Sequence, residues 1–250
     1  FLHLCSLDLY NPSLPAMSQD LQVSQRMVRG LVVTYLLGFS VSQLMYGAVS
    51  DALGRRKIFI FCVSFLMLSN FLTATAYTAT QLLVYRGLTG LVSGGCAIVS
   101  RSVLRDYIPE KGLLLSAFSK LNMLNAIGPA FAPILGGWVQ VTYGWRLNFV
   151  TLGVLCLLGL IIVCLFFKET HHVTKPFSFK DSVATYRSLI GYRDLWAYSI
   201  ISSLAFCCTM GYFTISPFIY QKVFHWTAFE NGLVYVFYAV PVSLGSLLTV

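Results

Sequence analysis

The sequence predicts an all-α integral membrane protein, and three observations support that prediction. Hydrophobic residues make up 57% of the 250 residues, charged residues make up only 10%, and the mean hydropathy is +0.74. A soluble domain of average composition would carry about a quarter charged residues. Apolar runs of about 20 residues recur along the chain, which is the length that an α-helix needs to cross about 30 Å of hydrocarbon.

Apolar runs separated by polar links predict eight membrane spans. The expected spans cover about 1–17, 28–50, 58–77, 80–100, 113–141, 147–167, 195–220 and 232–250. Because the sequence opens inside the first run and stops inside the last, we expect a fragment of a longer protein. The longest polar link predicts three parts: an N-terminal bundle at 1–168, a cytoplasmic linker at 169–193 and the start of a second bundle at 194–250.

The linker leaves two structures open. Its apolar residues are spaced to form one side of a short helix on the membrane surface, and they are Phe177, Phe179, Val183, Tyr186 and Leu189. A solvated, irregular segment is the alternative. Either structure would connect the two bundles on the cytoplasmic side.

The net charge is +8, and the basic residues are divided unequally between the two sides of the membrane. The links after the second, fourth and sixth spans carry eleven basic residues: Arg55, Arg56, Lys57, Arg101, Arg105, Lys111, Lys168, Lys175, Lys180, Arg187 and Arg193. The alternate links carry Arg26, Arg29, Arg146 and Lys222. The positive-inside rule makes the first group cytoplasmic, which predicts a multi-pass protein of the cytoplasmic membrane. Because the basic residues are spread over separate links, nucleic acid is not expected as a partner.

Cysteine and histidine give no sign of a metal site or a bound cofactor, and we expect neither. The cysteines fall in the expected spans without metal-ligand spacing, at Cys5, Cys62, Cys96, Cys156, Cys164, Cys207 and Cys208. They are expected to pack as small apolar residues. His171 and His172 are adjacent in the linker, with no second cluster to complete a site.

A charged hinge, GAVSDALGRRK at 47–57, joins the second and third spans. Gly54 permits a tight turn, Asp51 is placed to cap or face the positive end of the next helix, and the basic triplet marks the cytoplasmic side. The spacing resembles the loop motif of the major facilitator superfamily of secondary transporters, through Gly47, Asp51, Gly54, Arg55, Arg56 and Lys57. In that family the loop is a latch between the two halves of the molecule, so the resemblance implies the same role here.

The fifth span contains two prolines and three glycines between Asn125 and Gly137. Prolines bend a helix, and glycines allow a neighbour to approach closely. The segment resembles, in a stretched form, the G-P-x-x-x-G-G motif of antiporters in the same superfamily, through Gly128, Pro129, Pro133, Gly136 and Gly137. The alternative is a helix that is kinked for packing and carries no information about the direction of transport.

The fourth span carries Arg86, whose charge would cost about 2.5–3.5 kcal/mol at the centre of a membrane helix. It is followed by glycines that would let another helix pack closely: Gly87, Gly90, Gly94 and Gly95. Arg86 and Gly90 resemble the R-x-x-x-G motif that the superfamily links to proton transfer, although Thr89 replaces its usual glutamine. A side chain that snorkels to the outer interface is the alternative.

The acid Asp8 lies within an apolar run, in the sequence D-L-Y-N-P-S-L-P. This sequence resembles the first-helix signature of the Bcr/CflA-type branch of drug:proton antiporters. A carboxyl group in a medium of low dielectric constant binds a proton more readily, and a nearby cation favours its release. The resemblance therefore implies that Asp8 and Arg86 take part in proton coupling. The alternatives are an acid near the external interface or one neutralised by Arg86.

Charged residues at other helix ends also resemble this branch. Arg101, Arg105 and Asp106 follow the fourth span in an R-x-x-x-R-D pattern, and Lys168-Glu169-Thr170 closes the sixth. Solvated charges are the simpler interpretation of each.

The resemblance implies a major facilitator fold, with an N-terminal six-helix bundle and the first helices of a second bundle. It also implies proton-coupled efflux of small amphipathic compounds or drugs by alternating access, with a small-molecule substrate, protons and the lipid bilayer as partners. We expect a bacterial monomer. Candidate cavity residues besides Asp8 and Arg86 are Tyr10, Asn11, Tyr35, Gln43, Asn122 and Asn125. An exporter or importer of one metabolite or siderophore is the alternative on the same fold, and a membrane-embedded enzyme is a distant one.

Overall fold

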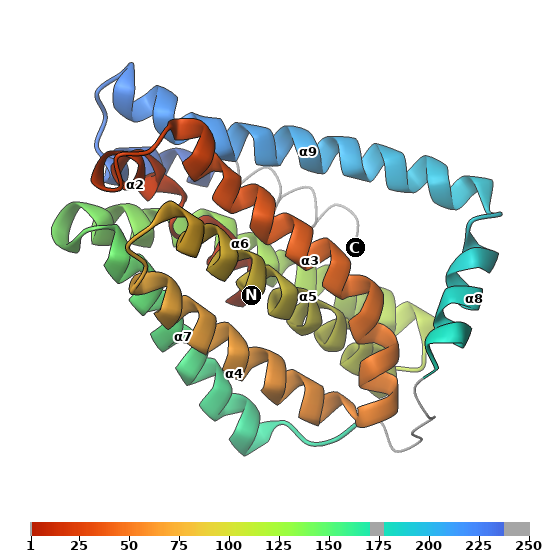
Figure 1. Ribbon diagram of the computed structural model, residues 1–250. Helices are drawn as coiled ribbons and strands as arrows, with labels where there is room; N and C mark the ends of the chain where they lie inside the picture. The colour runs from red at the N-terminus through yellow and green to blue at the C-terminus, as the bar shows by residue number, and fades with distance from the viewer. Residues whose placement is uncertain (1, 171–177, 238–250) are drawn as a thin grey trace.

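The computed structural model describes residues 2–170 and 178–237, and in that part of the chain the regular structure is entirely helical (Figure 1). The long helices are α3 (Gln25–Leu53), α4 (Arg55–Ala74), α5 (Ala79–Tyr107), α6 (Lys111–Tyr143), α7 (Trp145–Phe166) and α9 (Arg193–Lys222). All of these except α6 are long and apolar enough to cross a membrane. The predicted class of all-α integral membrane protein is confirmed.

The long helices lie where the sequence predicts the second to seventh spans, with ends that differ by a few residues. The next helix covers residues 228–237 and so begins before the predicted span at 232–250. Thr227 explains the earlier start, because its hydroxyl accepts a hydrogen bond from the backbone N–H of Glu230 (3.2 Å). The Glu230 carboxylate accepts in return from the Thr227 N–H (2.7 Å). Residues 238–250 of the predicted span lie outside the described residues.

The first span is interrupted, where the sequence predicts one run over 1–17. It is built from α1 (Leu2–Asp8), the short 3-10 helix η1 (Asn11–Ser13) and α2 (Leu14–Asp20), and α2 extends past the predicted end of the span, so that Asp20 lies beyond it. Pro12 and Pro15 stand in the first turns of η1 and α2, and a proline has no N–H to continue the preceding turn. The interruption places Asp8 at the end of α1 and leaves the last carbonyl groups of that helix without helical partners.

Helices α3 and α5 pack closely because glycines let their backbones approach (Figure 1). A Cβ atom at Gly90 would overlap the carbonyl oxygen of Tyr35, and one at Gly94 would overlap the hydroxyl of Ser42. Gly38 on α3 fits against the backbone of α5 in the same way. The glycine surface that the sequence predicts on the fourth span is therefore covered by α3.

The linker contains helix α8 (Phe179–Leu189), the first of its two expected structures. The hydroxyl of Tyr186 donates to the carbonyl oxygen of Leu44 on α3 (2.8 Å), while Val183 and Leu189 are exposed. Phe177 lies outside the described residues. Attachment of α8 to the membrane surface stays a prediction.

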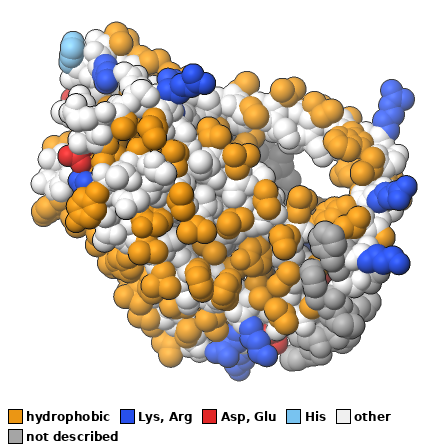
Figure 2. All heavy atoms as spheres, viewed as in Figure 1, with side chains coloured by type: hydrophobic (Ala, Val, Ile, Leu, Met, Phe, Trp, Pro, Cys, Tyr) orange, Lys and Arg blue, Asp and Glu red, His pale blue; other side chains and the backbone are white. Residues whose placement is uncertain are grey.

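Helix α9 contacts the bundle at its outer end and diverges from it toward the cytoplasm (Figure 1). The side-chain amide of Gln221 donates to the carbonyl oxygen of Pro12 (2.7 Å), and Phe213 and Phe218 are buried. Every residue from 193 to 208 is exposed. Figure 2 shows an opening beneath α9 on the side toward α8. With the sides assigned by the positive-inside rule, the space between α9 and the bundle opens toward the cytoplasm.

At the outer surface, the end of α2 is joined to the start of α7. Arg146 donates to the Asp20 carboxylate (2.7 Å), and the indole N–H of Trp145 donates to the same oxygen (3.0 Å). These hydrogen bonds, that of Arg146 first, lower the pKa of Asp20 below its ordinary value. Because the Asp20 side chain is 47% exposed, water screens the interaction and its contribution to stability is small.

We expect Gly90→Val to destabilise the protein by about 3 kcal/mol or more, because the side chain would have to displace the backbone of α3. Thermal unfolding of the purified full-length protein in detergent measures the effect. Gly47→Ala is the matched control on α3, because nothing lies within 4 Å of its added Cβ atom and alanine favours the helix by about 1 kcal/mol. A Gly90→Val protein as stable as the wild type would contradict this packing.

We expect Asp20→Asn to lower the free energy of unfolding by up to about 1 kcal/mol at neutral pH. The lowered pKa of Asp20 contributes stability above the ordinary aspartate pKa of about 3.9, and this contribution is lost as pH falls through the lowered value. The difference between variant and wild type should therefore shrink below about pH 4. Denaturant unfolding at neutral pH and at about pH 3.5 measures it. A difference that is constant over this range would be inconsistent with the ion pair.

Candidate functional site

The charged hinge between α3 and α4 turns at Gly54, whose φ of +96° lies in the region that favours glycine. Gly54 is both the C-cap residue of α3 and the N-cap residue of α4. A Cβ atom there would also lie only 2.6 Å from a carboxylate oxygen of Glu169. The backbone conformation therefore favours glycine at this position, and an added Cβ atom would displace the Glu169 carboxylate.

Glu169 caps the start of α4. Its carboxylate oxygens accept hydrogen bonds from the backbone N–H groups of Arg55 (2.9 Å) and Arg56 (3.1 Å). Such N–H groups have no helical partner, and the positive end of the helix favours a carboxylate. The sequence offers Asp51 for this role, but the structure gives it to Glu169. Asp51 lies before the turn, in the last turn of α3, and forms an ion pair with the Arg55 side chain.

The contact between α4 and α7 is reciprocal. Arg56 donates from its guanidinium to the carbonyl oxygens of Phe167 (2.7 Å) and Cys164 (3.1 Å) at the end of α7. The buried Arg55 donates to the carboxylate of Asp106 at the end of α5 (3.2 Å). The hinge thus joins three helix ends at the cytoplasmic surface.

We expect Glu169→Ala to lower the free energy of unfolding by about 1–2 kcal/mol, which is the usual cost of removing a helix cap. Asp51→Ala is expected to cost less than about 1 kcal/mol, because the Asp51 side chain is 52% exposed. Denaturant or thermal unfolding of the two full-length variants compares them. An equal or larger loss for Asp51→Ala would assign the cap to Asp51 after all.

Arg86 on α5 is completely buried inside the bundle. Its guanidinium lies between the rings of Tyr10 and Tyr35, at 4.4 and 4.6 Å from their centroids, and donates to the carbonyl oxygen of Ser6 (2.7 Å). Ser6 is in the last turn of α1, where carbonyl groups lack helical partners and a cation is favoured. This burial differs from the snorkelling alternative. Arg86 holds the interrupted first span against α5.

Asp8 is buried at the end of α1, with only 2% of its surface exposed. Within the described part of the chain it forms no ion pair, and its Oδ1 atom has no hydrogen-bond partner. Neutralisation of Asp8 by Arg86 is therefore not seen, because the guanidinium is turned toward Ser6 and the tyrosine rings. A buried carboxyl group in this setting favours a bound proton or a nearby cation.

A cavity of about 440 Å³ adjoins Asp8, between the bundle and α9. Its walls are mainly apolar and include the rings of Tyr35, Phe39, Phe206 and Phe213, together with the imidazole ring of His3. Arg101 on α5 and Pro129 on α6 also line it. This largely apolar space with few charged groups has the character of a small-molecule site.

The other predicted cavity residues do not gather in this space. Tyr10 and Asn11 are buried beside the interruption of the first span. Gln43 and Asn125 are half-buried and Asn122 is exposed, and none of the three lines the cavity. Their role in substrate binding stays a prediction.

The prolines of the fifth-span motif, Pro129 and Pro133, lie inside the single helix α6. A Cβ atom at Gly136 would overlap the backbone at the interruption of the first span, and one at Gly137 would overlap the backbone of the helix at 228–237. The glycine pair therefore lets α6 contact both the first bundle and the start of the second.

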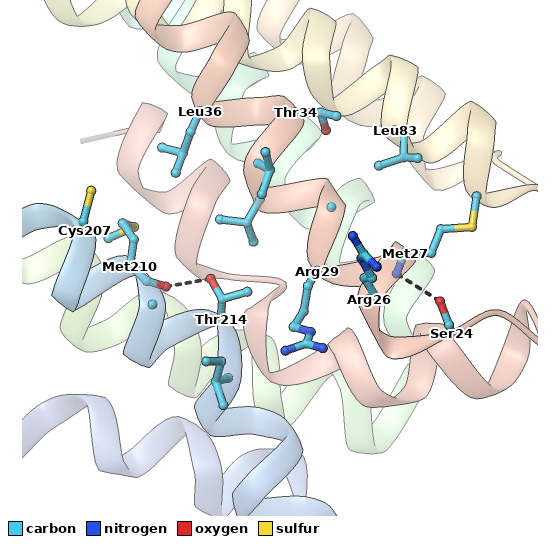
Figure 3. A pocket seen from close by; sticks show the side chains of 15 residues that line it. Ser24, Arg26, Met27, Arg29, Thr34, Leu36, Leu83, Cys207, Met210 and Thr214 are labelled. Atoms are coloured by element: carbon cyan, nitrogen blue, oxygen red, sulfur yellow. Dashed lines mark hydrogen bonds between the residues drawn. The ribbon is translucent and has the colours of Figure 1, made fainter.

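A second cavity of about 980 Å³ lies between the outer halves of α3 and α9 (Figure 3). Figure 3 shows Arg26 and Arg29 from α3 on its wall. Leu36 and Met210 line both cavities, so the two adjoin. The larger cavity has no carboxyl group among its lining residues, and the candidate site is therefore the smaller one, at Asp8.

The model of the family described as Major Facilitator Superfamily matches residues 1–249. The chain belongs to the Major Facilitator Superfamily. Membership confirms the family that the hinge and span motifs predict. It also assigns the chain to a family of transporters and not to an enzyme family.

Curated relatives of this superfamily chain come from bacteria. It is 30% identical over 223 residues to the uncharacterized MFS-type transporter YdgK of Bacillus subtilis (strain 168), covering 88% of this chain and 55% of the relative. It is 31% identical over 183 residues to Multidrug resistance protein D of Escherichia coli (strain K12), covering 73% and 46%. The chain spans about half the length of these relatives. They confirm the resemblance to the drug:proton antiporter branch and a multi-pass protein of the bacterial inner membrane.

Among solved structures, the chain is similar to a bacterial homolog of the human lysosomal transporter Spinster in an inward-facing, unoccupied conformation. The TM-score is 0.75 at 17% identity, covering 98% of this chain and 58% of the other. At this identity the similarity shows the fold alone. The predicted major facilitator fold is confirmed.

Proposed function

We propose that the intact protein exports small amphipathic compounds from the cytoplasm in exchange for protons, by alternating access. The observation that carries the proposal is the buried Asp8 carboxyl group, which lines an apolar cavity without an ion-pair partner in the described part of the chain. The similarity to Multidrug resistance protein D supports the choice of drug-like compounds as cargo.

In this mechanism a proton and a substrate compete for the Asp8 carboxyl group. An ionised carboxylate out of water is costly unless a cation pairs with it, so the group favours either a bound proton or a cationic part of the substrate. A substrate that enters from the cytoplasm displaces the proton inward. A proton that arrives from the outside displaces the substrate outward. Because the same carboxyl group binds either the proton or the substrate, binding of one releases the other, and the two are exchanged.

Arg86 acts as a positioning residue. Its hydrogen bond to Ser6 and its contacts with Tyr10 and Tyr35 fix the interruption of the first span, and so hold Asp8 at the cavity wall. The guanidinium forms no ion pair with Asp8 in the described part of the chain, so the Asp8 carboxyl group stays available to protons and substrate, although Nε and Nη1 of Arg86 also lack hydrogen-bond partners there.

Contacts at the two ends of the molecule support alternating access. The outer end is closed by Gln221 and Pro12, while α9 stands apart on the cytoplasmic side. A rocking motion that separates the outer contact and closes the cytoplasmic gap would turn Asp8 toward the outside. One charge crossing 100 mV supplies about 2.3 kcal/mol, enough for roughly a fifty-fold gradient of a neutral substrate per proton.

We expect Asp8→Asn in the full-length protein to abolish proton-driven transport, because an amide cannot bind and release a proton. In inside-out vesicles with an imposed proton gradient, the accumulation ratio of a fluorescent amphipathic compound should fall from up to about fifty-fold to about one. Asp8→Glu should retain coupling, and Asp20→Asn is the control for an acid outside the membrane. Unchanged gradient-driven transport by Asp8→Asn would refute the mechanism.

An exporter of one metabolite would behave differently in the same vesicles. Proton movement would then accompany that metabolite alone, and no dye would stimulate it. Such a result would replace the multidrug proposal while leaving proton coupling in place.

A further inference from the structure

Arg101 shares the cavity with Asp8 and has no assigned task. It is exposed, and within the described part of the chain no ion pair, hydrogen bond or cation–π contact engages its guanidinium. Three other arginines at this end of the molecule, on α4 and α5, differ. Arg55 and Arg56 are bound to carboxylate or carbonyl groups of neighbouring helices, and Arg105 lies over the ring of Phe118 at 6.0 Å.

The two charged groups of the cavity lie at different depths. Arg101 is on the cytoplasmic part of α5, fifteen residues after Arg86, which corresponds to about 22 Å along the helix axis. Asp8 lies near the level of Arg86, because Arg86 bonds to Ser6 on the same turn of α1. The Cα–Cβ bond of a helical residue tilts toward the helix N-terminus, which for α5 is the outer end. The Arg101 side chain therefore leans from the cytoplasmic end into the cavity.

Besides these two charges the lining is mainly apolar and aromatic, with Tyr35, Phe39, Phe206 and Phe213, and it also includes the polar side chains of His3 and Thr209. A simple cation would be attracted by Asp8 and repelled by Arg101. A compound with an amine at one end and an acid at the other would match both charges, and a guanidinium binds carboxylate or phosphate in a bidentate manner. A cavity of about 440 Å³ accepts a drug-sized molecule of this kind.

We propose that this cavity selects elongated amphipathic zwitterions, with the amine at Asp8, an aromatic or apolar middle, and a carboxylate or phosphate at Arg101. The inference rests on the proposed transport function and names its substrate class. Arg101 is then a specificity-determining residue and not only a marker of the cytoplasmic side.

A matched set of probes tests this assignment on the purified full-length protein. The zwitterion is aminomethyl-biphenyl-carboxylic acid, with its amine and acid at opposite ends of the two rings. Its carboxamide is a cation of the same shape, and its N-acetyl derivative is the corresponding anion. Equilibrium dialysis of the radiolabelled compounds measures the three dissociation constants.

We expect the wild type to bind the zwitterion more tightly than the cation or the anion. Arg101→Gln should weaken zwitterion binding by roughly ten- to a hundredfold and leave the cation unweakened, because only the charge-assisted hydrogen bond to the acid is lost. Arg101→Lys should restore part of the affinity. Arg105→Gln is the matched control, since it removes a neighbouring positive charge that does not line the cavity, and it should change none of the constants.

Two results would overturn the inference. One is that the wild-type protein binds the cation as tightly as the zwitterion. This measurement does not depend on the folding of any variant. The other is equal weakening of all probes by Arg101→Gln. Transport measurements in vesicles separate this inference from the proposed function. Gradient-driven export of the cation without preference for the zwitterion would contradict the proposed substrate class and leave proton-coupled export in place. Zwitterion binding that depends on Arg101, without any gradient-driven transport, would support the binding site and contradict proton-coupled export.

Discussion

The bond between the Arg86 guanidinium and the carbonyl oxygen of Ser6 is the interaction on which the site depends. In hydrocarbon, a helix that stops leaves carbonyl groups that water cannot reach, and each must find another partner. The first span stops at Asp8 because prolines follow, and Arg86 supplies a charged donor at that end. Its own charge is supported by two tyrosine rings. An interrupted helix therefore presents a carboxyl group to a cavity inside the membrane.

The same requirement organises the cytoplasmic end. The turn at Gly54 separates α3 from α4 and leaves N–H groups at the start of α4, while α7 ends nearby with free carbonyl groups. Glu169, which follows α7, accepts hydrogen bonds from the N–H groups at the start of α4. Arg56, at the start of α4, donates to a carbonyl group at the end of α7. The two helix ends therefore supply each other's hydrogen-bond partners. The hinge that marks the cytoplasmic side in the sequence is thus also a structural joint between three helices. Its role as a latch toward the second half remains a proposal.

The sequence predicts the spans well because hydropathy depends on local composition, whereas the partners of charged groups depend on distant contacts. Asp51 is the nearest acid in sequence to the start of α4, yet Glu169, more than a hundred residues away, supplies the cap. Of the two candidate cavity residues on α3, only Tyr35 lines the cavity, because Gln43 is eight residues further on and lies about 80° around the helix. The interruption beside Asp8 was not predicted, although Pro12 and Pro15 stand in the sequence, because a proline can bend a helix as well as end it.

Helix α6 is where movement of the two bundles can be coupled to the site. Gly136 accepts the backbone at the interruption of the first span, and Gly137 accepts the backbone of the helix at 228–237. Pro129, two turns earlier, lines the cavity beside Asp8. Glycines at these contacts let the backbones of neighbouring helices approach closely. A shift of the second bundle against α6 would therefore act on the cavity wall and on the end of α1 together. Substrate access and the environment of the carboxyl group would then change in one step.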